Sequence, residues 1–121
     1  MLHSGLAAAI GHQREYDPAF HFMGGAAGAY SFLRALNVFR ADLSPLSRRN
    51  PVLIVLAAVF AVTVAWEVIE FISDQLLGSH VQLGTDDTAM DILLGVLGAL
   101  CMLALAALVG RRPGISGNNA V

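Results

Sequence analysis

Charged residues are scarce in this sequence, and no Lys or Arg occurs between Asn50 and Gly110. Only 13% of the 121 residues are charged whereas 56% are hydrophobic, which is too apolar for an ordinary small soluble domain. No basic face with interleaved aromatic residues is present, so the sequence gives no indication of binding to nucleic acid. The composition predicts an integral membrane protein of one domain.

Cysteine is almost absent as well. Cys101 is the only one, which excludes a disulfide framework and a cysteine-based zinc site within a single chain. The segment from Met1 to Ile10 contains neither Lys nor Arg and only a short apolar patch, so it lacks the pattern of a cleavable secretory signal. We therefore expect insertion into a lipid bilayer to depend on the hydrophobic segments themselves.

Three hydrophobic segments predict an all-α fold, an integral membrane bundle of three transmembrane helices at about residues 19–39, 51–74 and 87–110. Asp17 before Pro18 indicates a turn ahead of the first helix. Pro51 suits the first turn of the second helix, and Gly110 suits the end of the third. The remaining ends are expected to be an N-terminal and a C-terminal tail, residues 1–18 and 111–121.

The arginines predict the orientation of this bundle. Three lie in the link from Arg40 to Asn50 and two in the C-terminal tail, whereas the loop from Gly78 to Asp87 has none. The positive-inside rule then places the link and the C-terminus in the cytoplasm, with the N-terminus and the acidic loop outside.

Six carboxylates lie between Asn50 and Gly110, on both sides of the loop that joins the last two helices. Glu67, Glu70 and Asp74 have the i, i+3, i+7 spacing of one helical face. Counting about 20 residues from each cytoplasmic helix end predicts a common depth, at the outer interface, for His21, Glu67, Glu70 and Asp91. Carboxylates at membrane depth are costly and usually functional, so this convergence predicts a site.

The predicted site combines one imidazole with several carboxylates, which repel one another unless a cation or protons neutralise them. Oxygen-rich ligation favours Ca²⁺, Mg²⁺ or Mn²⁺, and one added His also allows Zn²⁺ or Fe²⁺. We therefore predict a site for a divalent cation or for protons, with the candidate ligands His21, Glu67, Glu70, Asp87 and Asp91.

Structural explanations compete with this prediction. Asp86 and Asp87 suit the cap and first turn of a helix, where acids complement the helix dipole. Asp74 is expected to lie in water. An internal hydrogen-bonded network in which His21 and Thr63 take part would account for the remaining acids without any ligand.

Glycines mark candidate faces for helix packing. Gly24 and Gly28 have the G-x-x-x-G spacing, and Gly95 and Gly98 follow the acids of the last helix. Small residues allow membrane helices to approach closely. Because three short helices bury little surface alone, we expect a homo-oligomer or a larger membrane complex as well as contact with lipid.

An ordered series of short motifs extends from Tyr16 to Leu100. It consists of Tyr16-Asp17, His21-Phe22, Trp66-Glu67-x-x-Glu70-Phe71, Leu83-Gly84-Thr85, Asp87-Thr88-x-x-Asp91 and Leu97-Gly98-Ala99. In this combination the chain resembles the YjdF-like family of bacterial inner-membrane proteins. The resemblance implies a multi-pass protein without an established activity, whose motif positions include Asp17, His21, Glu67, Glu70, Asp87 and Asp91. Relatives tend to have further spanning segments ahead of this region, so we expect the chain to represent the motif-bearing C-terminal part.

Three functions remain open at this point. The first is a small multi-pass membrane protein whose outward-facing His/carboxylate cluster binds a divalent cation or protons. The second is an accessory subunit of a larger membrane protein complex, and the third is a metal-dependent membrane hydrolase. An enzyme is the least favoured, because one His supplies few nitrogen ligands and no nucleophile and base are paired. No catalytic residue and no organic cofactor are assigned.

Overall fold

The structure is a computed structural model that describes residues 2–39, 45, 49–78 and 84–110. This part of the chain contains three long helices, α1 (Leu2–Val38), α3 (Pro51–Leu77) and α4 (Thr85–Gly110). The all-α prediction is confirmed. Two of these helices, α3 and α4, are long and apolar enough to cross a membrane, whereas α1 is less apolar.

The ends of α3 and α4 have local causes in the sequence. Pro51 is the first residue of α3. An N–H at this position would have no acceptor within the helix, so the missing N–H of proline costs nothing there. Gly78 ends it in the left-handed conformation at φ 63°, and its N–H donates to the Asp74 carbonyl at 3.1 Å. Asp86 and Asp87 lie in the first turn of α4, as predicted from their fit to the helix dipole.

The first predicted boundary is wrong. Residues 2–18, expected to be a tail, are helical, and Pro18 lies inside α1 instead of following a turn at Asp17. A proline lacks the N–H of one helical hydrogen bond but does not forbid the helix when the turns on both sides continue. The helix α3 also extends beyond residue 74 to Leu77, and α4 begins at Thr85 instead of residue 87. The predicted C-terminal tail, residues 111–121, lies outside the described residues.

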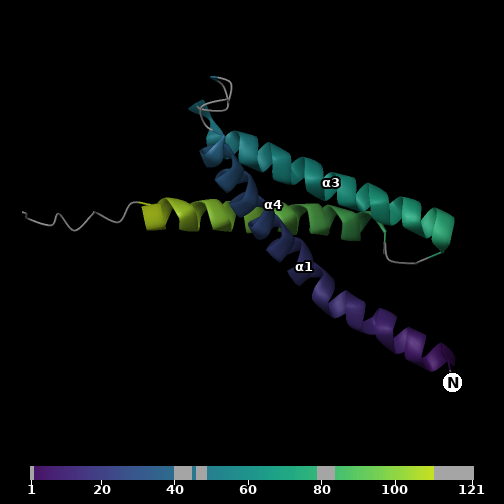
Figure 1. Ribbon diagram of the computed structural model, residues 1–121. Helices are drawn as coiled ribbons and strands as arrows, with labels where there is room; N and C mark the ends of the chain where they lie inside the picture. The colour runs from purple at the N-terminus through teal and green to yellow at the C-terminus, as the bar shows by residue number, and fades with distance from the viewer. Residues whose placement is uncertain (1, 40–44, 46–48, 79–83, 111–121) are drawn as a thin grey trace, which may run out of the picture.

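The helices run alternately up and down, and Figure 1 shows α1 crossing the α3/α4 pair at an angle. The end of α1 lies near the start of α3, and α3 and α4 run side by side in opposite directions. The most extensive contact is between α1 and α4. The least apolar helix, α1, therefore packs extensively against α4.

Nearly every fourth residue of each helix is buried in the centre of the bundle. The buried positions are His21, Gly25 and Ala29 of α1, Val55, Val59, Thr63 and Glu67 of α3, and Asp91, Gly95, Gly98, Ala99 and Leu103 of α4. Rows at four-residue spacing are the ridges that interdigitate when helices cross obliquely. This spacing agrees with the crossing of α1 over α4 in Figure 1.

The buried positions form successive layers. At one end is an ionisable layer of His21, Glu67 and Asp91. The next layer, one helical turn away on each helix, consists of Gly25, Gly95 and Thr63, and we call it the glycine layer. Beyond it lies an apolar core cluster of Ala29, Val55, Val59, Ala99 and Leu103.

Large apolar side chains cover the outside of the bundle. On α3 they include Phe60, Trp66 and Ile69, each at least half exposed, and α1 presents Phe20 and Tyr30 in the same way. Exposure of this much contiguous apolar surface is unfavourable in water and is what a lipid-facing surface requires.

The backbones of α1 and α4 are in direct contact at Gly25, Gly95 and Gly98. A Cβ on Gly25 would overlap the Gly95 carbonyl, and a Cβ on Gly98 would overlap the carbonyl of Phe22. Gly28 is less constrained, since its Cβ would lie 3.6 Å from the Val59 side chain.

Gly24 makes no packing contact between the described helices of the bundle, so its predicted packing role stays a prediction for contact with another chain. No atom lies within 4 Å of the position that its Cβ would take, whereas its neighbour Gly25 lies in the interface. Of the two glycines in the G-x-x-x-G spacing, only Gly28 faces another helix within the described residues.

The adjacent glycines provide a matched test of this packing. Gly25→Ala is expected to lower the free energy of unfolding by about 1–3 kcal/mol, because its methyl group forces α1 away from α4. Gly24→Ala should have no such penalty, and both changes alter helix propensity equally. Unfolding followed by circular dichroism in detergent micelles measures the difference. Equal stability of the two variants would contradict the described contact.

Candidate functional site

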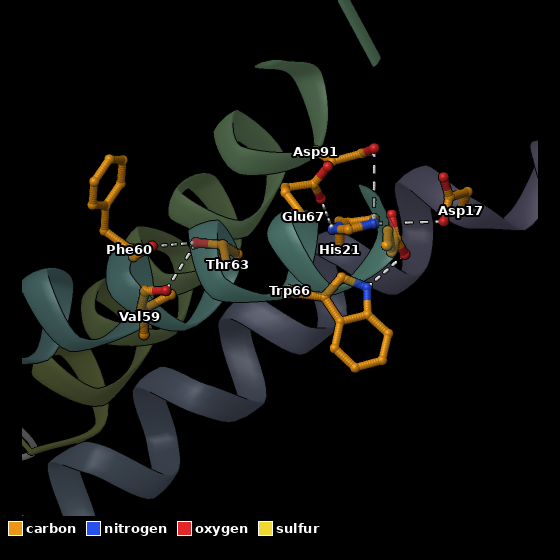
Figure 2. Close-up of polar contacts among 9 residues, drawn as sticks. Asp17, His21, Val59, Phe60, Thr63, Trp66, Glu67 and Asp91 are labelled. Atoms are coloured by element: carbon orange, nitrogen blue, oxygen red, sulfur yellow. Dashed lines mark hydrogen bonds and ion pairs between the residues drawn. The ribbon is translucent and has the colours of Figure 1, made fainter. Parts of the chain in front are cut away.

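The ionisable layer brings together side chains from all three helices. His21 of α1, Glu67 of α3 and Asp91 of α4 are 8%, 4% and 3% exposed. Figure 2 shows the imidazole between the two carboxylates. Glu70, one helical turn after Glu67 on α3, is half-buried beside them.

The contacts of His21 divide the cluster into two sides. Its Nε2 atom lies 3.5 Å from Asp17 Oδ1 and 3.8 Å from Asp91 Oδ2. Its Nδ1 atom lies 3.8 Å from Glu67 Oε1 on the other side of the ring. Two groups of possible metal ligands result, in each of which the ligand atoms lie within 4.8 Å of one another: Asp17, His21 and Asp91, and His21, Glu67 and Glu70.

Glu67 carries a buried oxygen that no donor satisfies. Its Oε1 atom has no hydrogen-bond partner among the residues that the structure describes, although Glu67 is 96% buried and faces His21. Burying a carboxylate oxygen without a donor costs about 1–3 kcal/mol or more. The group therefore requires an explanation, such as a bound ion or a proton.

Glu70 is held by the only tryptophan of the chain. The Trp66 indole N–H donates to Glu70 Oε1 at 2.6 Å, across one turn of α3 (Figure 2). A hydrogen bond to a charged acceptor is about twice as strong as a neutral one. The bond fixes the orientation of Glu70, which forms one group of possible metal ligands with His21 and Glu67.

Thr63 does not extend the polar cluster. Its hydroxyl lies 2.8 Å from the Val59 carbonyl and 3.0 Å from the Phe60 carbonyl, both on its own helix (Figure 2). Its methyl group meets Gly95 in the glycine layer. A hydroxyl bonded to the preceding turn in this way is not directed at Glu67.

The structure brings four of the five predicted ligands together. His21, Glu67, Glu70 and Asp91 lie in the two ligand groups, whereas Asp87 lies in neither. Among the acids assigned structural roles, Asp86 is exposed at the start of α4, and Asp74, expected in water, is half-buried.

Asp17 belongs to the cluster, although the site prediction from spacing and depth did not include it. Asp17 and His21 have the i, i+4 spacing of one helical face, which was available as a signal. Pro18 obscures this signal, because Asp17 followed by a proline indicates a turn ahead of the helix. Only the resemblance had marked Asp17 as a motif position.

One family model, described as "Predicted membrane protein (DUF2238)", matches residues 6–112. The chain belongs to this family, which is the YjdF-like family that the motifs indicated. It is accordingly a membrane protein with two candidate spans, α3 and α4. No curated protein and no solved structure matches the chain significantly.

The bond between Trp66 and Glu70 can be tested by a double-mutant cycle. We expect Trp66→Phe and Glu70→Ala to show a coupling energy of about 1–2 kcal/mol, because the donor and the charged acceptor meet directly. The free energy of unfolding in detergent gives all four corners of the cycle. Additive single changes would show that the two side chains do not interact.

Proposed function

We propose that this member of the DUF2238 family binds a divalent cation in the cluster of His21 and the carboxylates around it. The observation that carries the proposal is the buried Glu67 Oε1, which faces His21 without any hydrogen-bond donor. A cation between the imidazole nitrogen and this oxygen would satisfy both atoms at once.

The charges of the cluster support a cation. Glu67 and Asp91 are almost fully buried, and neither α3 nor α4 contains a Lys or Arg that could neutralise them. Arg34 of α1 is exposed and lies 13 residues after His21, which is about 20 Å along a helix. One divalent cation balances the two buried carboxylates while His21 remains neutral.

The distances support the same conclusion. The nitrogen–oxygen separations of 3.5, 3.8 and 3.8 Å are longer than ordinary hydrogen bonds. Two ligands each about 2.1 Å from a tetrahedral metal ion lie about 3.4 Å from one another. Each nitrogen–oxygen pair around His21 is therefore spaced more like two ligands of a shared ion than like the partners of a hydrogen bond.

One imidazole among carboxylates favours Mn²⁺, Fe²⁺ or Zn²⁺ over Ca²⁺ or Mg²⁺, which bind almost entirely through oxygen. Asp17 and Glu70 are partly exposed, so they give the ion a route from the surface. Asp87 precedes Asp91 by one helical turn but belongs to neither ligand group, so we assign it no direct bond to the ion.

We further propose that α1 is a third span, with the loop between α3 and α4 on the outer side of a bacterial inner membrane. The exposed apolar side chains of α1, among them Phe20 and Tyr30, support contact with lipid. The distribution of arginines supports the orientation. The ionisable layer then lies toward the outer surface, as predicted from its depth.

Cation binding can be measured on the purified protein after treatment with a chelator. In calorimetric titrations with Mn²⁺ and with Zn²⁺, we expect at least one of the ions to bind wild type. Glu67→Gln and His21→Gln should weaken its binding by more than about 100-fold, since each removes a direct ligand. At a free concentration of 100 times Kd, the ion should also add about 2.7 kcal/mol to the free energy of unfolding of wild type.

Asp86→Asn is the matched control, because Asp86 is an exposed acid on α4 outside both ligand groups. This variant should bind the ion as wild type does. Absence of binding to wild type, or equal binding by wild type and Glu67→Gln, would contradict the proposal and leave protons as the ligand.

The orientation can be tested with single cysteines in a Cys101→Ala background. A cysteine at Ser79, between α3 and α4, should react with a membrane-impermeant maleimide on intact cells. A cysteine at Ser44, between α1 and α3, should react only after the cells are permeabilised. The opposite labelling pattern would reverse the proposed orientation.

A further inference from the structure

We infer that the cation binds at the Nδ1 side of His21, together with Glu67 and Glu70, and that the Nε2 side holds the imidazole proton between Asp17 and Asp91. This inference rests on the proposed cation site. It divides the five residues of the cluster into three ligands, His21, Glu67 and Glu70, and two positioning residues, Asp17 and Asp91.

A neutral imidazole offers one N–H donor and one lone pair, on opposite sides of its ring. In this structure each nitrogen of His21 faces carboxylate oxygens, Nδ1 toward Glu67 and Nε2 toward Asp17 and Asp91 (Figure 2). On one side of the ring, the N–H can donate to a carboxylate oxygen. On the other side, the nitrogen lone pair faces a carboxylate oxygen, and neither atom has a donor. A cation belongs on that second side.

The unsatisfied oxygen indicates which side this is. Glu67 Oε1 is buried without a donor and lies 3.8 Å from Nδ1, beyond hydrogen-bond distance. A proton on Nδ1 would therefore leave this oxygen unsatisfied. Nε2 has the shortest of the three contacts, 3.5 Å to Asp17, so an N–H on Nε2 lies nearer to an acceptor than an N–H on Nδ1 would. Asp91 lies on the same side of the ring, 3.8 Å from Nε2.

A second carboxylate of the ligand group that contains Glu67 is already oriented. Glu70 accepts the Trp66 indole N–H at 2.6 Å through Oε1 and joins His21 and Glu67 in one ligand group. The ligand group with the unsatisfied oxygen thus also has a pre-oriented member. On the opposite side, Asp17 precedes His21 by one turn of α1, which suits it to hold the ring in position.

A metal-bound His usually donates its other N–H to a carboxylate, and losing that carboxylate weakens binding by about 10–100-fold. Asp17 and Asp91 would act in this way. They fix the tautomer that leaves the Nδ1 lone pair free for the ion, and they do not bind the ion themselves.

The test uses the full chain in detergent, labelled with ¹⁵N-histidine and titrated with ¹¹³Cd²⁺. His21→Gln identifies the His21 signals. We expect one bound cadmium resonance coupled to His21 Nδ1, with the proton on Nε2. Coupling to Nε2, or two bound cadmium ions that share the ring, would overturn the inference while leaving the cation site intact. Absence of any bound cadmium, together with no binding of Mn²⁺ or Zn²⁺, would remove the cation site itself.

Variants separate positioning from ligation. Asp17→Asn should weaken binding of cadmium by about 10–100-fold and shift the His21 tautomer in the cation-free protein, whereas Asp17→Glu should restore both. Asp17 is chosen because its side chain is 29% exposed, so a change there is better tolerated than at buried Asp91. Glu67→Gln should abolish binding and leave the tautomer unchanged. An unchanged tautomer in Asp17→Asn would overturn the positioning role.

Discussion

The arrangement of this protein depends on the backbone contact between α1 and α4. A Cβ on Gly25 would overlap the Gly95 backbone of α4, and a Cβ on Gly98 would overlap the Phe22 backbone of α1. His21 precedes Gly25 by four residues, and Asp91 precedes Gly95 by four, so the contact places these two side chains one helical turn away from it on the same side. The distance of 3.8 Å between His21 Nε2 and Asp91 Oδ2 is thus a consequence of the glycines.

In a membrane, close packing between helices matters more than it does in water. Lipid is as apolar as the outer side chains of the bundle, so burial of apolar surface does not draw the helices together, and packing of small residues has to do so. The core cluster accordingly combines two alanines with Val55, Val59 and Leu103, while larger side chains such as Phe60 point outward. The buried ionisable groups are the exception in the interior and lie together in one layer.

The sequence could predict the helices α3 and α4 and the four residues that converge, because charge is so rare there that each carboxylate stands out. It could not choose between Gly24 and Gly25, since both fit an apolar helix and only the path of α4 decides which of them is in contact. Asp17 was missed for a related reason. From the sequence alone, Pro18 indicates a helix boundary, but α1 continues through it. Only the structure therefore shows that Asp17 and His21 lie one turn apart on the same helix.

The ionisable layer would be unfavourable on its own, because Glu67 and Asp91 are buried without a basic partner from α3 or α4. The glycine layer and the core cluster next to it hold the three helices together at this point, and this packing is what brings the acids together. A preassembled site does not have to order its ligands when the ion binds, which raises affinity at the expense of stability in the ion-free protein. Each helix contributes to the cluster, and α1 contributes the imidazole that faces both sides. Any ion held there therefore favours the docked position of α1, the least apolar of the three helices and the one that lipid alone retains least.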